Sequence, residues 1–355
     1  YVNVSIYMIK LKYKVKRLKE GSVIGVVSPS WSGPASFPHV YEKGLENLKK
    51  YFGFKIKEFS NTRMQYDGSL DYVKKRVKDI HDAFFDDSVD AIFLSIGGDD
   101  AIRLLPYLDK KIIEAHPKIV MGFSDSTNIL IYLVKLGIPA FHGPSIMAGF
   151  AEPEGLSEEF VNHFRTFYFD NWKTYTYPRY KNWTEDRGGW SDPDFLNRKK
   201  IYKENTAVHI LGGNIKSEGI LIGGCIEIIE MLKGTEFGLT KSDFENSAFF
   251  LETSEDKPSP DYVKCALRSY GVAGAFNGIQ SILIGKSRGY TDDEYKKLEE
   301  YISTVIQKEF NNSRISIISN FDIGHTQPIW ILPIGIKTRI DSENKTIELV
   351  ESPFK

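Results

Sequence analysis

The chain has 355 residues, a length at which a single hydrophobic core usually stops growing, so two domains in close contact are expected. Its 46 Lys and Arg residues nearly balance 47 Asp and Glu residues, and the formal net charge is -1. This balance leaves no overall electrostatic field to attract nucleic acid or an anionic membrane. We therefore expect a small-molecule partner, with no nucleic acid and no membrane.

Three further features narrow the class of protein. No apolar run approaches the roughly 18 residues that a membrane-spanning helix needs. Lysines interrupt the apolar residues of the basic segment 1–20, so it has no signal-peptide core, and a cytoplasmic location is expected. The 2 cysteines, Cys225 and Cys265, have neither a metal-ligand nor a redox spacing. Neither a metal nor a cofactor is expected.

The first half of the chain alternates short apolar strands with helical segments. Strands are predicted at about residues 22–28, 54–59, 91–96 and 118–123, and helices at about 40–52, 70–85 and 101–108. Continuous apolar strands separated by helices are typical of a parallel sheet that is covered on both faces. We predict that residues 21–170 form a doubly wound, Rossmann-like α/β domain, preceded by an N-terminal extension of residues 1–20.

The pattern changes in residues 171–202, where tryptophans and tyrosines are interleaved with basic residues and glycines. We interpret this segment as an aromatic linker or flap between two domains. Beyond it, strands are predicted near 208–211, 247–251, 278–284 and 314–319, and helices near 225–232, 259–270 and 291–309. Residues 203–355 are thus predicted to form a smaller, mixed α/β domain.

Ser124 lies between a predicted strand that ends at Gly122 and an amphipathic helix that starts near Thr127. A serine on such a turn exposes its hydroxyl at the carboxyl edge of the sheet, beside helix N-terminal amides that can bind an oxyanion. Ser124 is therefore a candidate nucleophile, although Ser126 stands where the G-x-S-x-G pattern has its second glycine. The alternative is that Ser124, Asp125 or Ser126 only caps the helix.

A nucleophilic serine needs a base, and the base needs a group that orients it. Glu252 ends a strongly apolar strand, where an unpaired carboxylate is costly, and His325 lies in a turn-rich loop after another strand. Ser124, His325 and Glu252 would fill the roles of nucleophile, base and orienting acid. Local roles for Glu252 and His325, in a salt bridge and a turn cap, are the alternatives. His142 and His209 are rival bases.

Paired glycines, Gly97 and Gly98, follow a predicted strand and precede a helix. Glycines there let a ligand approach the backbone and leave amide N–H groups free for an anion. In a hydrolase, the Gly98 and Asp125 amides would form the oxyanion hole. The segment also resembles the phosphate loop of diacylglycerol and NAD kinases, but Asp100 adds a second negative charge where phosphate would lie. A non-hydrolytic phosphate- or nucleotide-binding module is the distant alternative.

Short motifs along nearly the whole chain from about Lys19 resemble the LD-carboxypeptidase family of serine peptidases. They lie at residues 25–30, 97–100, 122–125, 142–144, 219–225, 251–253 and 324–326. The resemblance implies a serine-type carboxypeptidase with a Ser124–Glu252–His325 triad, oxyanion-hole amides at Gly98 and Asp125, no metal, and a homodimer with its active site at the domain junction. Within the family, residues 251–256 and the long aromatic segment resemble the microcin C immunity branch.

The resemblance leaves two amide substrates open. The microcin C immunity branch cleaves the amide between an aminoacyl group and a modified nucleotide, whereas murein tetrapeptide carboxypeptidases cleave a peptidoglycan peptide. Trp183 and Trp190 are suited to stacking on a nucleobase, and Arg187 is a candidate partner for a carboxylate, as are Arg179 and Lys181. We predict that Trp190, beside two glycines, lies on a movable flap. Packing at the domain interface is the alternative role of the aromatic side chains.

Overall fold

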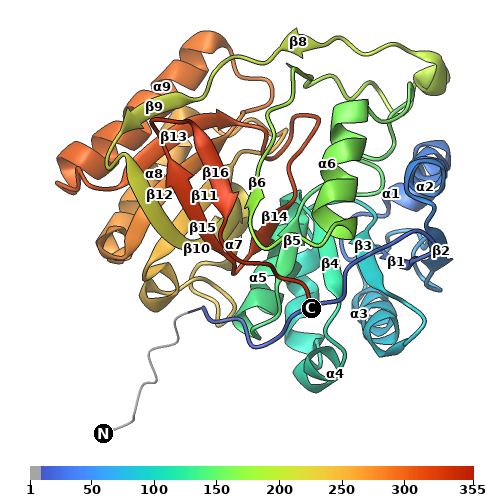
Figure 1. Ribbon diagram of the computed structural model, residues 1–355. Coiled ribbons are helices and arrows are strands. Elements are labelled where there is room, and N and C mark those ends of the chain that lie inside the picture. The colour runs from blue at the N-terminus through green and yellow to red at the C-terminus, as the bar shows by residue number, and fades with distance from the viewer. Residues whose placement is uncertain (1–8) are drawn as a thin grey trace, which may run out of the picture.

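The computed structural model describes residues 9–355. Within that range, the N-terminal half is built on a six-stranded sheet with the order β14-β5-β4-β3-β1-β2 (Figure 1). All neighbouring strands run parallel except β14, which pairs antiparallel with β5. The strands are β1 (Val23–Val27), β2 (Lys55–Glu58), β3 (Ala91–Leu94), β4 (Ile119–Gly122), β5 (Ala140–His142) and β14 (Leu332–Ile334).

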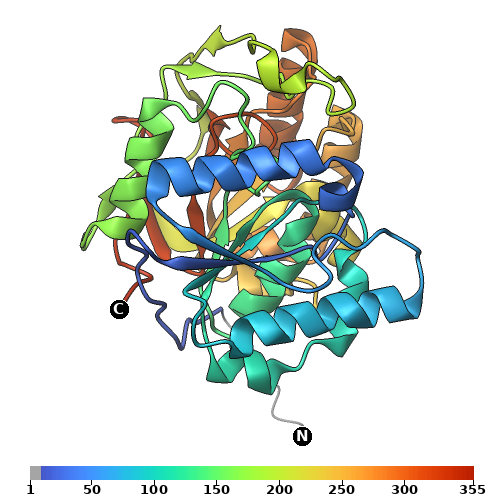
Figure 2. The same cartoon turned by 90° about the vertical axis from the view of Figure 1, so that its right-hand side faces the viewer.

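Helices cover both faces of this sheet, and Figure 2 shows α2 and α3 on either side of its β2 edge. They are α1 (Gly33–Ser36), α2 (Pro38–Phe52), α3 (Leu70–Phe85), α4 (Lys110–Ala115), α5 (Thr127–Lys135) and α6 (Glu158–Phe169). The helix predicted at 101–108 is a 3-10 helix over Ala101–Tyr107 that contains Pro106. The doubly wound, parallel-sheet prediction for this half is confirmed.

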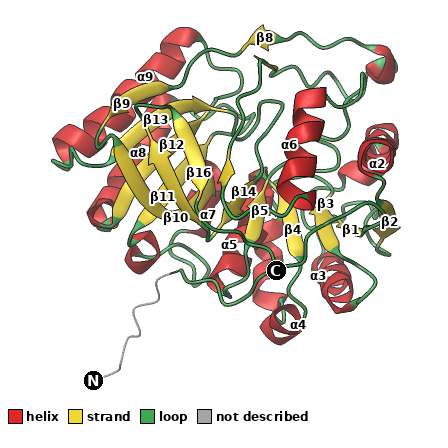
Figure 3. Cartoon of the chain, in the orientation of Figure 1, coloured by secondary structure: helices red, strands yellow, loops and turns green. Residues whose placement is uncertain are grey.

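The C-terminal half contains a mixed sheet of eight strands, ordered β6-β16-β15-β10-β11-β12-β13-β9 (Figure 3). The core strands β10 to β13 run parallel, and antiparallel strands flank them on both sides. The strands are β6 (Tyr175–Thr176), β9 (His209–Gly212), β10 (Lys216–Cys225), β11 (Ser247–Glu252), β12 (Ile279–Gly285), β13 (Ser316–Phe321), β15 (Lys337–Asp341) and β16 (Thr346–Leu349). The mixed α/β prediction is confirmed.

The remaining elements surround this second sheet. Helices α7 (Ile226–Leu232), α8 (Pro260–Val272) and α9 (Asp292–Ser303) pack outside it, and α9 continues as a π-helix over Thr304–Glu309. Short 3-10 helices lie at Ser124–Ser126, Phe195–Asn197, Lys241–Phe244 and Ala275–Asn277, and a small hairpin pairs β7 (Asn182–Trp183) with β8 (Lys203–Glu204). No helix in residues 9–355 has the length and apolar character needed to cross a bilayer.

The two halves are interleaved rather than joined end to end. Strand β14 comes from the C-terminal half but completes the N-terminal sheet, and β6, which lies in the aromatic segment 171–202, pairs with β16 at the edge of the other sheet. Part of the segment predicted as an N-terminal extension is also packed: Val15 is buried and bridges to Phe354, while residues 1–8 lie outside the described range. The carboxyl ends of β3, β4, β11 and β13 lead into the loops of the candidate site.

Candidate active site

Ser124 has a left-handed backbone conformation, with φ +61°. The chain leaves β4 at Gly122, turns through the 3-10 helix Ser124–Ser126, and continues directly into α5. Within the described residues, neither the 3-10 helix nor α5 has a side-chain cap hydrogen bond at its N-cap, so the capping alternative is not supported. A positive φ at a non-glycine residue is strained, and such strain is common where a nucleophile is held on a sharp turn.

His325 and Glu252 form a buried pair. His325 Nδ1 lies 2.6 Å from Glu252 Oε2, and both side chains are fully shielded from solvent. A Cβ at Gly324, where φ is +91°, would lie 2.6 Å from Glu252 Cβ and 2.7 Å from its carboxyl carbon. Glycine at this position therefore lets the loop close over the carboxylate. Glu252 is placed to fix the orientation of the imidazole through Nδ1, which leaves Nε2 as the nitrogen available for proton transfer.

The pair lies next to the serine turn. The ring of Phe123, directly before Ser124, packs edge-on against His325 with centroids 4.9 Å apart. Burial alone would lower the pKa of His325, but the carboxylates of Glu252 and Glu255 raise this pKa to about 9. The structure thus places the His325–Glu252 pair, which comes from the C-terminal sheet, against the residue that precedes Ser124 on the turn after β4.

Neither rival histidine has the same setting. His142 is fully buried, neither of its ring nitrogens has a hydrogen-bond partner among the described residues, and its ring packs against Phe123 and Phe250. Burial lowers the pKa of His142 to about 4. His209 lies on edge strand β9 and pairs with Glu299 at 2.7 Å. The geometry favours His325 as the base.

Gly97 packs directly against the serine turn, and Gly98 follows it in the same loop. A Cβ at Gly97 would lie 2.9 Å from Ser124 Oγ and 3.4 Å from the Asp125 nitrogen, so any side chain there would fill the space in front of the hydroxyl. Gly98 has φ +142°, a conformation that other residues rarely adopt. Gly97 and the Asp125 amide therefore border the same small space beside Ser124 Oγ, whereas a Cβ at Gly98 would meet Ser30 and Trp31.

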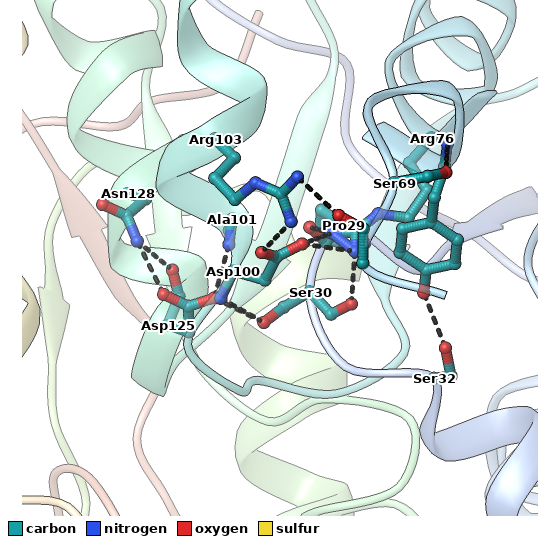
Figure 4. A network of polar contacts seen from close by, with 12 residues as sticks. Pro29, Ser30, Ser32, Ser69, Arg76, Asp100, Ala101, Arg103, Asp125 and Asn128 are labelled. Carbon is teal, nitrogen blue, oxygen red and sulfur yellow. Dashed lines mark hydrogen bonds and ion pairs between the residues drawn. The ribbon is translucent and has the colours of Figure 1, made fainter. Parts of the chain in front are cut away.

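The side chain of Asp125 links this turn to the glycine loop (Figure 4). Its Oδ2 accepts hydrogen bonds from the Ser30 hydroxyl and, at 2.8 Å, from the Ala101 backbone N–H, while its Oδ1 accepts one from Asn128 at 2.6 Å. Burial raises the pKa of Asp125, and the Ser30 and Ala101 donors oppose that shift. A carboxylate that bridges two loops in this way fixes their separation.

Asp100 extends the network on the other side of the glycine loop (Figure 4). Arg76, which is 2 % exposed, donates to Asp100 Oδ2 at 3.0 Å and to the carbonyls of Pro29 and Ser30 at 2.5 and 2.6 Å. Arg103 donates to Asp100 Oδ1 at 2.8 Å. Asp100 is thus a buried anchor, and the sequence analysis missed Arg76 because it lies on α3, far away in the chain.

The three predicted substrate contacts lie in different places. Arg187 is buried between Phe123 and His325: its guanidinium carbon lies 5.3 Å from the Phe123 ring centroid, and Nη2 donates to the His325 carbonyl at 3.3 Å. Trp190 stacks on Trp31, with centroids 6.1 Å apart and planes 10° apart. Trp183 instead lines a separate cavity of about 590 Å³.

Glu255 is a further charged group at the site that the sequence analysis did not single out. Its Oε2 lies 2.8 Å from His325 Nε2, while 48 % of its side chain is exposed. Burial would raise the pKa of Glu255, but His325 and Arg187 together lower it below its usual range.

Within residues 9–355, no three His, Cys, Asp or Glu side chains are grouped in a way that could hold a metal ion.

Comparisons with known proteins identify the family. The LD-carboxypeptidase N-terminal domain matches residues 24–143, and the LD-carboxypeptidase C-terminal domain matches residues 218–340. The chain belongs to the LD-carboxypeptidase family. The family resemblance in the sequence motifs is therefore confirmed, and the protein is an enzyme of a carboxypeptidase family.

Individual relatives cover nearly the whole chain. The microcin C7 self-immunity protein MccF of Escherichia coli is 28 % identical over 342 residues, which is 94 % of each chain. YocD of Bacillus subtilis is 32 % identical over 339 residues, 93 % of this chain and 96 % of that protein. A structure of MccF in complex with glutamyl sulfamoyl guanosine has a TM-score of 0.82 at 26 % identity and covers 96 % of this chain and 99 % of that one. This LD-carboxypeptidase thus has MccF among its relatives in both sequence and structure.

Proposed function

We propose that this LD-carboxypeptidase is a serine hydrolase of the microcin C immunity type, which cleaves the amide between an aminoacyl group and a modified nucleotide. The observation that carries the proposal is the buried Glu252–His325 pair, 2.6 Å apart, beside the strained turn of Ser124. A base oriented by a carboxylate next to a serine on a sharp turn is the arrangement that acyl transfer requires.

In the proposed reaction, Ser124 Oγ attacks the amide carbon while His325 Nε2 takes the hydroxyl proton. The Gly98 and Asp125 amides stabilise the negative oxygen of the tetrahedral intermediate. His325 then returns the proton to the amide nitrogen, which leaves as the C–N bond breaks and an acyl-enzyme remains. Water, deprotonated by His325, hydrolyses the acyl-enzyme and regenerates the serine. Glu252 holds the imidazole in place throughout.

We propose that side chains of the aromatic segment 171–202 recognise the substrate. The Trp190 indole offers a stacking surface for a nucleobase, provided that it separates from Trp31. Arg187 has an Nε without a hydrogen-bond partner among the described residues, and burial lowers its pKa to about 10, an effect that Glu255 opposes. Such a buried cation suits a carboxylate, sulfamate or phosphate. Trp183, in its separate cavity, is proposed as a more distant contact.

A direct experiment offers the purified protein two substrates, an aminoacyl sulfamoyl nucleotide and a murein tetrapeptide, and identifies the cleaved amide by mass spectrometry. The proposal expects cleavage of the nucleotide conjugate and labelling of the wild type, but not of Ser124→Ala, by a fluorophosphonate. Cleavage of the murein peptide alone would instead make the protein a murein tetrapeptide carboxypeptidase, with Arg187 bound to the peptide carboxylate. No labelling, together with nucleotide binding, would favour the non-hydrolytic module.

The substrate contacts have their own test. If Trp190 stacks on the base, Trp190→Ala should raise KM for the nucleotide conjugate about tenfold or more, because base stacking contributes about 1–3 kcal/mol. A parallel Trp183→Ala variant should have a smaller effect. An unchanged KM in Trp190→Ala would contradict the flap proposal.

A cytoplasmic location and a homodimer stay predictions. Size-exclusion chromatography with light scattering tests the homodimer.

A further inference from the structure

Glu255 lies in the position that the proposed nucleophile must use. In acyl transfer, the serine hydroxyl has to approach His325 Nε2 to within hydrogen-bond distance. In the structure Glu255 Oε2 lies 2.8 Å from that nitrogen, yet Nε2 has no aligned hydrogen bond to any residue in 9–355. The Glu255–His325 contact is thus a short electrostatic contact that lacks the alignment of a hydrogen bond.

The charged and titratable groups around His325 come from three parts of the fold: β11 with the loop after it, the aromatic segment, and β5. Glu252, on β11, holds Nδ1, and Arg187, in the aromatic segment, donates to the backbone carbonyl. His142, on β5, is buried nearby, and its low pKa keeps it neutral. Among the charged groups of residues 9–355 named here, Glu255 is the one that approaches Nε2, and its side chain is half-exposed whereas the others are buried.

We infer that Glu255 is a latch on the catalytic base, which holds His325 Nε2 in the free enzyme and moves to an ammonium group of the substrate when the substrate binds. The inference rests on the proposed hydrolase function. The aminoacyl group supplies the ammonium: its α-amino nitrogen is two bonds from the carbonyl carbon that Ser124 attacks. A carboxylate beside Nε2 therefore lies within a few ångströms of that nitrogen in any productive arrangement. Glu255 then determines specificity for acyl groups with a free amine.

The loop around Glu255 allows such a movement. It lies between β11 and α8, outside both elements, and its preceding residue Ser254 is anchored by Glu227, which accepts from the Ser254 backbone N–H at 3.1 Å. Glu255 and its neighbour Asp256 are both exposed. Rotation of the Glu255 side chain alone would free Nε2, with no rearrangement of the buried Glu252–His325 pair.

The first test compares pH profiles of the wild type and Glu255→Gln. The profile of kcat/KM reports the free enzyme, and that of kcat reports the substrate complex. In the wild type, Glu255 contacts His325 in the free enzyme but not in the substrate complex. The loss of activity on the acid side should therefore occur at a lower pH in the kcat profile than in the kcat/KM profile. In Glu255→Gln, the kcat/KM limb should shift downward by about one pH unit, since a carboxylate at this distance stabilises the imidazolium by that much or more. Asp256→Asn is the matched control and should leave both limbs in place.

The second test compares substrates with a free and an acetylated α-amino group. The wild type should prefer the free amine by about tenfold or more, the value of a charged hydrogen bond. Glu255→Gln should lose most of this preference, while Asp256→Asn should keep it. Unchanged pH limbs and an unchanged preference in Glu255→Gln would overturn the inference. Loss of activity at every pH with the limb in place would also overturn it, because Glu255 would then only position the substrate.

A spectroscopic measurement separates failure of the latch from failure of the hydrolase proposal. Nitrogen-15 NMR of histidine-labelled protein, with His325 assigned through His325→Gln, reports whether both ring nitrogens carry protons. The latch expects the imidazolium form of His325 at neutral pH in the wild type and a lower titration midpoint in Glu255→Gln. If neither protein cleaves an amide or reacts with a fluorophosphonate, the function is wrong. If the midpoint does not change, the latch is wrong.

Discussion

Glycines at single positions determine the geometry around Ser124 and His325. Gly97 leaves the space in front of the Ser124 hydroxyl open, and Gly324 lets the His325 loop approach the carboxylate of Glu252. Each is a place where an added methyl group would meet a group of the proposed triad. At the residue scale, therefore, the absence of a side chain at Gly97 and Gly324 is as necessary for this geometry as the side chains of the proposed triad.

Gly324→Ala should disable catalysis out of proportion to its effect on stability. The new Cβ would displace Glu252, and a shift of about 1 Å in a catalytic group typically lowers the rate about 100-fold. The control Gly21→Ala has a similar positive φ, +80°, but nothing lies within 4 Å of its new Cβ. Both variants should lose about 1–2 kcal/mol from backbone strain, measured by urea unfolding. Equal activity in the two variants would contradict the role given to the Gly324 contact.

The pKa of His325 also links protonation to stability. Its pKa of about 9 in the folded protein lies above the usual value of 6.5, so the imidazolium stabilises the fold fully below about pH 6.5, and this contribution is lost as the pH rises through 9. The unfolding free-energy difference between the wild type and His325→Gln should therefore shrink from pH 6 to pH 9.5. Urea titrations at several pH values measure it. A difference that stays constant with pH would show that the imidazolium is not stabilised.

The candidate triad residues could be proposed from local sequence, but their charged neighbours could not. Ser124 and Glu252 stand at strand ends, and His325 stands in a loop after a strand, which are positions that place side chains at a sheet edge. Arg76 and Glu255 gave no comparable signal. Arg76 occupies a helical position, and Glu255 is one of several acidic residues in its loop, so only the folded chain reveals their contacts with Asp100 and His325.

At the element scale, the glycine loop 97–101 depends on helix α3. Arg76, from the middle of that helix, donates to Asp100 and to two carbonyls of the loop after β1. Strand β10 was not predicted from the sequence. Its glycines resemble loop residues, but a Cβ at Gly223 would lie 2.7 Å from the Phe250 carbonyl carbon, so they serve close packing within the sheet.

Arg76→Met should loosen the glycine loop and weaken the fold. Removing one partner leaves Asp100 buried with only Arg103, and breaking a buried ion pair costs about 3–5 kcal/mol. We expect kcat to fall about tenfold or more where the protein still folds, since the Gly98 amide proposed for the oxyanion hole would lose its anchor. Arg103→Ala, which removes a partly exposed partner, should cost about 1 kcal/mol or less. Steady-state kinetics and urea unfolding of both variants provide the comparison.

At the scale of the whole molecule, the proposed triad exists only because the two halves are combined. Ser124 follows a strand of one sheet, Glu252 ends a strand of the other and His325 follows another of its strands, while β14 and β6 exchange between the halves. The sequence predicted two α/β units correctly but not this exchange, because β6 and β14 have only 2 and 3 residues and no periodicity. The consequence is that neither half should unfold without the other.

The chain ends provide a test of this coupling. Phe354 is 3 % exposed and packs against Phe141, Phe167 and Trp172, which belong to the N-terminal half or directly follow it, and the guanidinium of Arg17 lies 4.5 Å from its ring centroid. Phe354→Ala should cost about 3–5 kcal/mol, as expected for a buried aromatic side chain.

The effect of Phe354→Ala should reach the active site although the residue takes no part in it. Tryptophan fluorescence and enzymatic activity should be lost in one coincident urea transition, at a lower midpoint than in the wild type, because the N-terminal sheet includes a strand of the C-terminal half. The control Phe85→Ala removes a ring that is 68 % exposed and should change the midpoint little. Two separate transitions, with activity lost in only one of them, would mean that the halves unfold independently and that the exchanged strands do not couple them.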